Sequence, residues 1–187
     1  TMLGMKIYTG LLVSLTALTG YRFFRTKMPA WLAFAGEVAA IGLCWCPTVI
    51  LYNYLTYFLF LLGCVFLFRG LAGCRNGCLV LAGICLGLNA FSRFPGNVLE
   101  AALILALWYY GALKGKKTQK ILLETGLCAA GYAAAFAVAA VTASVWHGGN
   151  VFSEMIQGVL GMAGSASDYT FGEMLYAILD AYGHGLR

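Results

Sequence analysis

Apolar residues occur along this chain in long runs that are separated by short polar or basic breaks. The runs lie at residues 3–24, 30–46, 49–68, 77–92, 97–113 and 121–146. A helix needs roughly 20 apolar residues to cross the hydrocarbon core of a bilayer, and several runs approach that length. The pattern predicts an all-α fold, a polytopic transmembrane helix bundle of about six spans over residues 1–146. The second, fourth and fifth runs are short, so tilt, bilayer thinning or a re-entrant path is open there.

The remaining residues, 147–187, have a different pattern. Residues 147–150 form a predicted turn. Two stripes with helical spacing follow, the first at Val151, Phe152, Met155, Ile156, Val159 and Leu160 and the second at Phe171, Met174, Leu175, Ile178, Leu179 and Tyr182. Thr170 and Glu173 fit a capping box at the start of the second stripe. We expect two outward-facing amphipathic interfacial helices, with a small soluble domain as the alternative.

Composition supports the membrane interpretation. Of 187 residues, 61% are hydrophobic and 10% are charged, whereas about 25% of a soluble domain is charged. The net charge of +5 does not indicate a nucleic-acid partner, because the basic residues lie between apolar runs and form no patch with interleaved aromatic residues. Most of the 7 cysteines fall inside apolar runs and are expected to be packing residues.

No metal site or cofactor is expected. Cys44 and Cys46 lie close together, as do Cys74 and Cys78, but no four-ligand set with histidine emerges from the sequence. No phosphate-binding loop, dinucleotide fingerprint or nucleophile elbow is present either.

The basic residues alternate between the two sides of the predicted bundle. The breaks on one side carry Arg22, Arg25, Lys27, Arg69, Arg75, Lys114, Lys116, Lys117 and Lys120. The other side carries Lys6, Arg93 and Arg187. Basic loops face the cytoplasm, which predicts a multi-pass protein of the inner (plasma) membrane with both chain ends outward. Because an outward start without a signal is unusual, we expect the chain to be an excerpt with upstream spans that pack against it.

Small residues predict close helix packing. Gly83 and Gly87 form a GxxxG step that lets another helix approach closely. The last run is rich in small residues, which suggests a helix buried among its neighbours; these are Ala129, Ala130, Gly131, Ala133, Ala134 and Ala135.

Two outward breaks carry the candidate binding residues. Arg93 lies beside Pro95, where a helix must end, and a guanidinium there can form a fork on a phosphate. Snorkelling of Arg93 to the interface is the alternative. Asn53, with Tyr52 and Tyr54, could line a sugar or lipid-phosphate site, or form an interfacial aromatic belt with a helix cap.

Two acidic residues inside apolar runs are also candidates, because charges in spans are costly. Glu37 could handle protons or ions, or could pair with Arg22, Arg25 or Lys27 near the cytoplasmic end. Glu100 is close enough in sequence to Arg93 to pair with it across the outer turn.

Residues 29–113 resemble bacterial polytopic glycosyltransferases of the GT-C class, the protein-mannosyltransferase-like family. The resemblance covers under half of the chain. It is carried by Pro47-Thr48, Tyr52-Asn53-Tyr54-Leu55-Thr56, Phe68-Arg69-Gly70-Leu71, Arg75-Asn76-Gly77, the segment 81–88 with its two glycines, and Ser92-Arg93-Phe94-Pro95.

The resemblance implies transfer of a sugar from a polyprenyl-phosphate carrier to an acceptor on the outer face of the membrane. Its expected partners are membrane lipids and the polyprenyl-phosphate-linked sugar, with Arg93, Asn53, Tyr52 and Tyr54 as candidate donor-binding residues. The family's catalytic carboxylate lies in the first outward loop, and residues 47–53 contain no acid. The catalytic acid is therefore expected outside this chain, unless the chain is not a competent enzyme. A transporter or flippase and a non-enzymatic scaffold subunit are the alternative functions.

Overall fold

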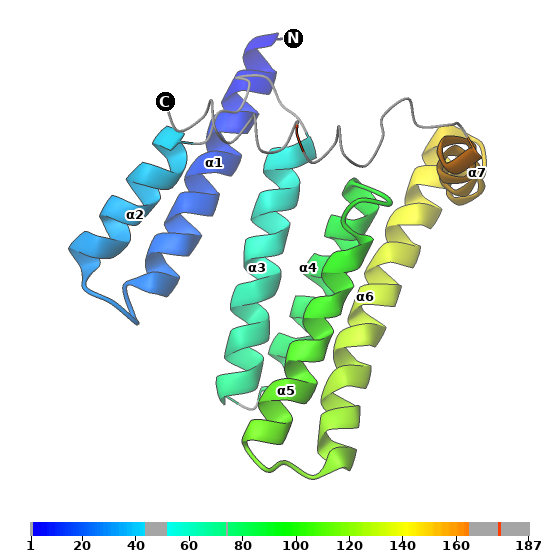
Figure 1. Cartoon of the computed structure of the whole chain (residues 1–187). Coiled ribbons are helices and arrows are strands. Elements are labelled where there is room, and N and C mark those ends of the chain that lie inside the picture. Colours follow the sequence, from blue (N-terminus) through cyan, green and yellow to red (C-terminus); the bar gives the residue numbers. More distant parts are fainter. Residues whose placement is uncertain (1, 44–51, 74, 165–175, 177–187) are drawn as a thin grey trace. The chain divides into compact units, whose positions relative to one another are not determined.

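The computed structural model describes residues 2–43, 52–73, 75–164 and 176, and the regular structure of these residues is helical (Figure 1). The chain divides into two compact units, Thr1–Gly149 and Asn150–Arg187.

The described residues of the first unit form six helical segments at the positions of the six predicted runs. They are α1 (Met2–Phe24), α2 (Ala30–Leu43), α3 (Tyr52–Gly73), α4 (Asn76–Ser92), the 3₁₀ helix η1 (Val98–Ile104) that continues into α5 (Leu105–Leu113), and α6 (Thr118–His147). Helix α3 continues past the predicted end at residue 68, so Arg69 lies within the helix and not in the turn. The fifth run is a 3₁₀ turn followed by an α-helix.

Three of these helices are long and apolar enough to cross a membrane, namely Leu3–Phe24, Asn53–Gly73 and Thr118–His147. The segments Ala30–Gly42, Asn76–Ser92 and Val98–Leu113 are apolar but shorter. The expected all-helical fold is therefore confirmed, and three helices in the part of the chain that is described are long and apolar enough to cross a membrane.

Successive helices of the first unit run in opposite directions (Figure 1). The α1–α2, α3–α4 and α5–α6 connections consequently lie at the same end, the lower one in Figure 1. This arrangement gathers the nine basic residues of the alternate breaks at one end of the unit, and Arg93 lies at the other end. The sequence pattern and the helix directions thus agree on a strongly asymmetric charge distribution.

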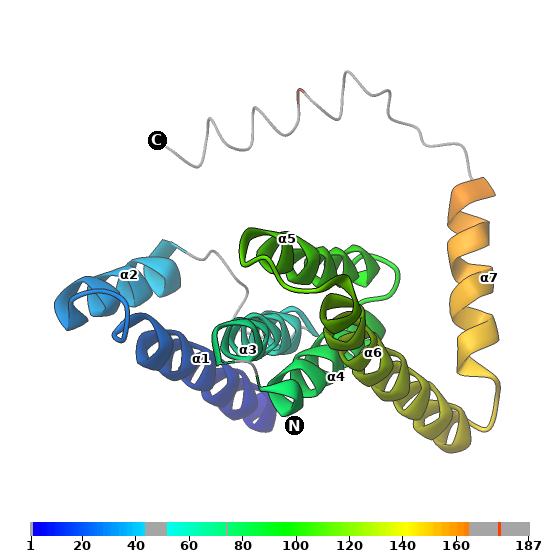
Figure 2. The ribbon, with the colours of Figure 1, turned by 90° about the horizontal axis from the view of Figure 1, so that it is seen from below.

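Helix α4 lies at the centre of the packing. It contacts both α3 and α6, while α2 contacts α1 and α1 contacts α3 (Figure 2). The core cluster draws one or two residues from each of α3, α4, α5 and α6: Leu67, Leu79, Ala82, Leu107 and Cys128. Many large apolar side chains of α1, α2 and α6 point outward, as expected of surfaces that face lipid.

The predicted glycine step does bring two helices together. A Cβ added to Gly83 would lie 2.9 Å from the backbone nitrogen of Tyr132, and one on Gly131 would lie 3.3 Å from that of Ile84. Gly87 likewise meets the backbone of Tyr132. The backbones of α4 and α6 therefore pack directly against each other, which only residues without a Cβ permit at this separation.

The alanine-rich helix α6 is not buried all round, so that expectation was wrong in part. Its buried residues are spaced three, four or five apart in a single stripe: Ile121, Glu124, Cys128, Gly131, Ala135 and Ala140. Ala129, Ala130, Ala133 and Ala134 are exposed on the other faces. Small size alone cannot distinguish the side facing protein from the side facing lipid.

In the second unit, α7 (Val151–Gly164) is a helix over the residues of the first predicted stripe. The predicted turn before it is also found: α6 ends at His147, and its C-cap residue Gly148 has a φ of 73°, in the left-handed region that favours glycine. The side-chain Oδ1 of Asn150 accepts a hydrogen bond of 3.2 Å from the backbone N–H of Ser153, and so caps α7. The second predicted helix and its capping box lie outside the described residues, apart from Tyr176, which is helical.

Candidate functional site

A network of polar side chains supports the α4–η1 connection, where the chain reverses direction. Asn89 is completely buried in α4, and its side-chain N–H donates a hydrogen bond to a carboxylate oxygen of Glu100 in η1. Asn97, which is 8% exposed, donates from its side-chain amide to Oδ1 of Asn89 at 3.2 Å. Buried polar groups that hydrogen-bond to one another fix the geometry of a turn. The side chains of Asn89, Asn97 and Glu100 therefore stabilise this connection.

The backbone of Arg93 is hydrogen-bonded to two residues of this network, Asn89 and Asn97. Arg93 is the C-terminal cap residue of α4: its backbone N–H donates to the carbonyl of Asn89 at 3.3 Å, and its own carbonyl accepts from the N–H of Asn97 at 3.0 Å. The side chain is exposed. The backbone of Arg93 is therefore fixed while its guanidinium remains available at the end of the unit opposite the basic loops.

The predicted pairing of Arg93 with Glu100 is not a salt bridge in the described part of the chain. The two charges interact electrostatically at longer range. Glu100 bonds to Asn89 instead, because α4 and η1 pack against each other and place the buried amide next to the carboxylate. The Glu100 carboxylate therefore faces α4, because its hydrogen-bond donor is the completely buried amide of Asn89.

The other predicted donor-binding residues begin helix α3. Asn53 is half-buried, and its side-chain Oδ1 is a buried acceptor without a hydrogen-bond partner among the described residues. Its carbonyl accepts the Thr56 hydroxyl at 2.8 Å. Tyr52 is the first helical residue of α3. The outward break before it, residues 44–51, which includes Pro47, lies outside the described residues.

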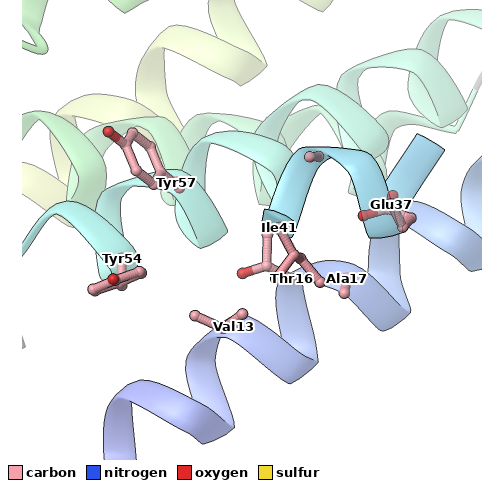
Figure 3. Close-up of a pocket in the computed structure, with 8 residues that line it drawn as sticks. Val13, Thr16, Ala17, Glu37, Ile41, Tyr54 and Tyr57 are labelled. Atoms are coloured by element: carbon pink, nitrogen blue, oxygen red, sulfur yellow. The ribbon is translucent and has the colours of Figure 1, made fainter. Parts of the chain in front are cut away.

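Tyr54 lines a cavity, whereas Arg93 is not among the described residues that line it. The cavity lies between α1, α2 and α3, has a volume of about 390 Å³, and is also lined by Tyr57 from the same helix as Tyr54 (Figure 3). Asn53 lies at the start of α3 and Arg93 at the end of α4, and these two antiparallel helices contact each other, so both residues lie at the same end of the unit. The assignment of the four residues to one donor site stays a prediction.

Glu37 lines the same cavity from α2, and its carboxylate packs against Gly20 of α1. The predicted pairing with Arg22, Arg25 or Lys27 is absent among the described residues. Two of these basic residues interact with aromatic rings instead: the Arg25 guanidinium lies 6.0 Å from the Tyr21 ring centroid, and the Lys27 ammonium lies 4.9 Å from that of Phe68.

Sequence reasoning missed one charged pair. Lys116, in the α5–α6 connection, approaches both carboxylate oxygens of Glu124 in α6, at 2.8 and 2.9 Å. Glu124 is 2% exposed and Lys116 is 11% exposed. The available signal was an acidic residue shortly after the start of the last apolar run, just beyond the lysine cluster. The pair lies at the basic end and joins two consecutive helices, so its geometry indicates a structural role.

Searches of family models, of curated proteins and of solved structures find no match to this chain.

Proposed function

We propose that this chain is part of a multi-pass protein of the inner (plasma) membrane, with all six helical segments of the first unit as spans. The support is the length and hydropathy of α1, α3 and α6, together with the collection of nine basic residues at one end (Figure 1). That end would face the cytoplasm. The shorter segments would cross by local thinning of the bilayer or be shielded by neighbouring helices.

The second unit would then lie at the outer surface. Helix α7 begins four residues after α6 ends, so its start is held near a membrane boundary. Its apolar residues recur along one side while Ser153, Glu154 and Gln157 are polar. A helix of this kind lies in the interface with its apolar face toward the acyl chains.

We further propose that the protein transfers a sugar from a polyprenyl-phosphate carrier at the outer face, and that Arg93 binds the carrier phosphate. The observation that carries this proposal is the position of Arg93. Its side chain is exposed, its backbone is fixed by hydrogen bonds to Asn89 and Asn97, and it lies at the end of the unit opposite the nine basic residues. A phosphate at the headgroup level would receive two parallel N–H donors from a planar guanidinium. Such a contact also stabilises the charge that develops on the leaving phosphate.

The other donor-binding candidates would act on the sugar. The side-chain Oδ1 of Asn53 is an acceptor without a hydrogen-bond partner among the described residues, and a sugar hydroxyl would be a suitable donor to it. Tyr52 and Tyr54 belong to the same turn of α3. The carboxylate base that sugar transfer requires is assigned to no residue of this chain.

The test compares two lipids and three variants of the full-length protein in nanodiscs. The lipids are polyprenyl phosphate and the corresponding polyprenol, which lacks the phosphate. We expect Arg93→Ala to weaken polyprenyl-phosphate binding about tenfold or more, because a charge-assisted hydrogen bond contributes roughly 1.5–3 kcal/mol. Arg93→Lys should retain part of the affinity, since lysine keeps the charge and loses the fork.

Lys6→Ala is the matched control, because Lys6 is an exposed basic residue of α1 on the same side as Arg93 by the alternation of the runs. It should leave binding unchanged. The proposal fails if Arg93→Ala binds polyprenyl phosphate as tightly as the unaltered protein, or if the unaltered protein binds polyprenol equally well.

A further inference from the structure

The cavity between α1, α2 and α3 has the features of a second binding site. It is lined by Val13, Thr16, Ala17, Glu37, Ala40, Ile41, Tyr54 and Tyr57, and its volume is about 390 Å³. Arg93 does not belong to this lining, so the cavity is distinct from the phosphate contact proposed above, and Tyr54, a candidate sugar contact, is common to both proposals. A volume of this size is within the range of small-molecule pockets.

Among the described lining residues, the one charged group is the Glu37 carboxylate, and none is basic. Glu37 lies toward one end of the cavity and the two tyrosines toward the other (Figure 3). The salt bridge of the described residues is elsewhere, between Lys116 and Glu124. A carboxylate in apolar surroundings is costly unless a cation neutralises it. The cavity therefore favours a ligand that carries a positive charge at the Glu37 end.

The rest of the lining is mostly apolar. Val13, Ala17 and Ile41 occupy the part of the cavity between Glu37 and the tyrosines (Figure 3). The Thr16 hydroxyl donates to the Leu12 carbonyl at 2.7 Å, so it does not offer its proton to a ligand. A strongly hydroxylated ligand would find few partners on these walls, whereas an aliphatic body would be well accommodated.

We propose that this cavity binds an organic cation, a primary alkylamine in its protonated form. Its ammonium would pair with the Glu37 carboxylate, and its aliphatic body would lie along α1 and α2. The rings of Tyr54 and Tyr57 would cover the far end of the body by apolar contact.

The test uses hexylamine and its neutral counterpart hexan-1-ol, with the full-length protein in nanodiscs at neutral pH. Equilibrium dialysis of each radiolabelled compound measures saturable binding, and empty nanodiscs correct for partitioning into lipid. We expect Glu37→Gln to lower the affinity for hexylamine about tenfold or more, with hexanol binding unchanged. Glu37→Asp should keep part of the amine affinity because it keeps the charge.

Glu154→Gln, in α7, is the matched control: it removes an acidic residue from outside the cavity and should leave hexylamine binding unaltered. The comparison of amine and alcohol in the unaltered protein needs no variant, so a folding defect in Glu37→Gln leaves the test decisive. Equal affinities for hexylamine and hexanol would overturn the proposal. So would equal hexylamine affinity in the unaltered protein and Glu37→Gln, or the absence of saturable binding.

Discussion

The two sides of the first unit use glycine in opposite ways. Between α4 and α6, Gly83, Gly87 and Gly131 bring the helix backbones into direct contact, and an added Cβ would collide with the neighbouring backbone. In α1 and α2, Gly10 and Gly36 face open space, with no atom within 4 Å of an added Cβ. Gly83, Gly87 and Gly131 therefore mark a direct contact between backbones, whereas Gly10 and Gly36 meet open space and Gly20 meets the end of the flexible Glu37 side chain.

The difference separates structural residues from candidate binding residues. Lipid is as apolar as the helix surfaces, so close packing and polar contacts are what hold membrane helices together. The α4–α6 side has both, namely the glycine contact and the Lys116–Glu124 pair. The α1–α3 side is less tightly packed and contains the cavity with Glu37. A cavity that is to admit a ligand requires this looser packing.

The largest effect is expected from removing the Lys116–Glu124 ion pair on the α4–α6 side. Lys116→Ala leaves the Glu124 carboxylate, which is 2% exposed, without its partner. Breaking a buried pair in this way costs about 3–5 kcal/mol. We expect a loss of that order in the free energy of unfolding, measured by denaturant titration in mixed micelles.

Two further variants qualify the result for the ion pair. Lys117→Ala changes an exposed neighbour in the same connection and should cost well under 1 kcal/mol. The double variant Lys116→Ala with Glu124→Ala should be more stable than Lys116→Ala alone, because no uncompensated charge remains. If Lys116→Ala and Lys117→Ala had equal free energies of unfolding, the ion pair would not contribute to the stability of the fold.

A smaller effect is expected from a single methyl group in the helix contact. In Gly83→Ala the new Cβ would lie 2.9 Å from the Tyr132 nitrogen and closer still to the Cys128 carbonyl. Both obstacles are backbone, so the helices must separate. Overpacking of this kind costs about 1–3 kcal/mol, which the same titration would detect.

Gly10→Ala makes the identical change in α1, where nothing lies within 4 Å. It should leave stability unchanged or raise it slightly, because alanine favours helix more than glycine does. Equal destabilisation by Gly83→Ala and Gly10→Ala would remove the distinction between the two sides.

Much of this architecture is predictable from the sequence, because hydropathy and basic breaks follow from the cost of placing charge in lipid. The six apolar runs coincide with the six helical segments, and the Gly83–Gly87 step correctly predicted a close contact. The turn at residues 147–150 was also correctly predicted.

The side-chain partners were harder to predict, for a physical reason. A membrane helix is apolar on both its lipid-facing and its protein-facing sides, so periodicity does not identify the packed stripe of α6. For the same reason, the bond between Asn89 and Glu100 and the pair of Lys116 with Glu124 depend on which helices become neighbours. Residues 44–51 and most of the second amphipathic stripe are outside the described residues, so those predictions stand as made.

The smallest effect is expected from filling the cavity between α1, α2 and α3. Ala17 lines the cavity from α1, and Ala17→Leu would extend three additional carbons into that space. A buried methylene group contributes about 0.8 kcal/mol. The cavity is only partly enclosed, so we expect a gain of about 1 kcal/mol in the free energy of unfolding.

The control for this change is Ala129→Leu, which places the same side chain on an exposed face of α6 and should leave stability unchanged. Ala17→Leu should at the same time weaken hexylamine binding, because the new side chain would occupy the region next to Glu37 that the aliphatic body requires. A loss of stability in Ala17→Leu would mean that α1, α2 and α3 already pack closely around Ala17. In that case the contrast between the two sides would lie in the ion pair and the glycines alone, and the space for a ligand would be missing.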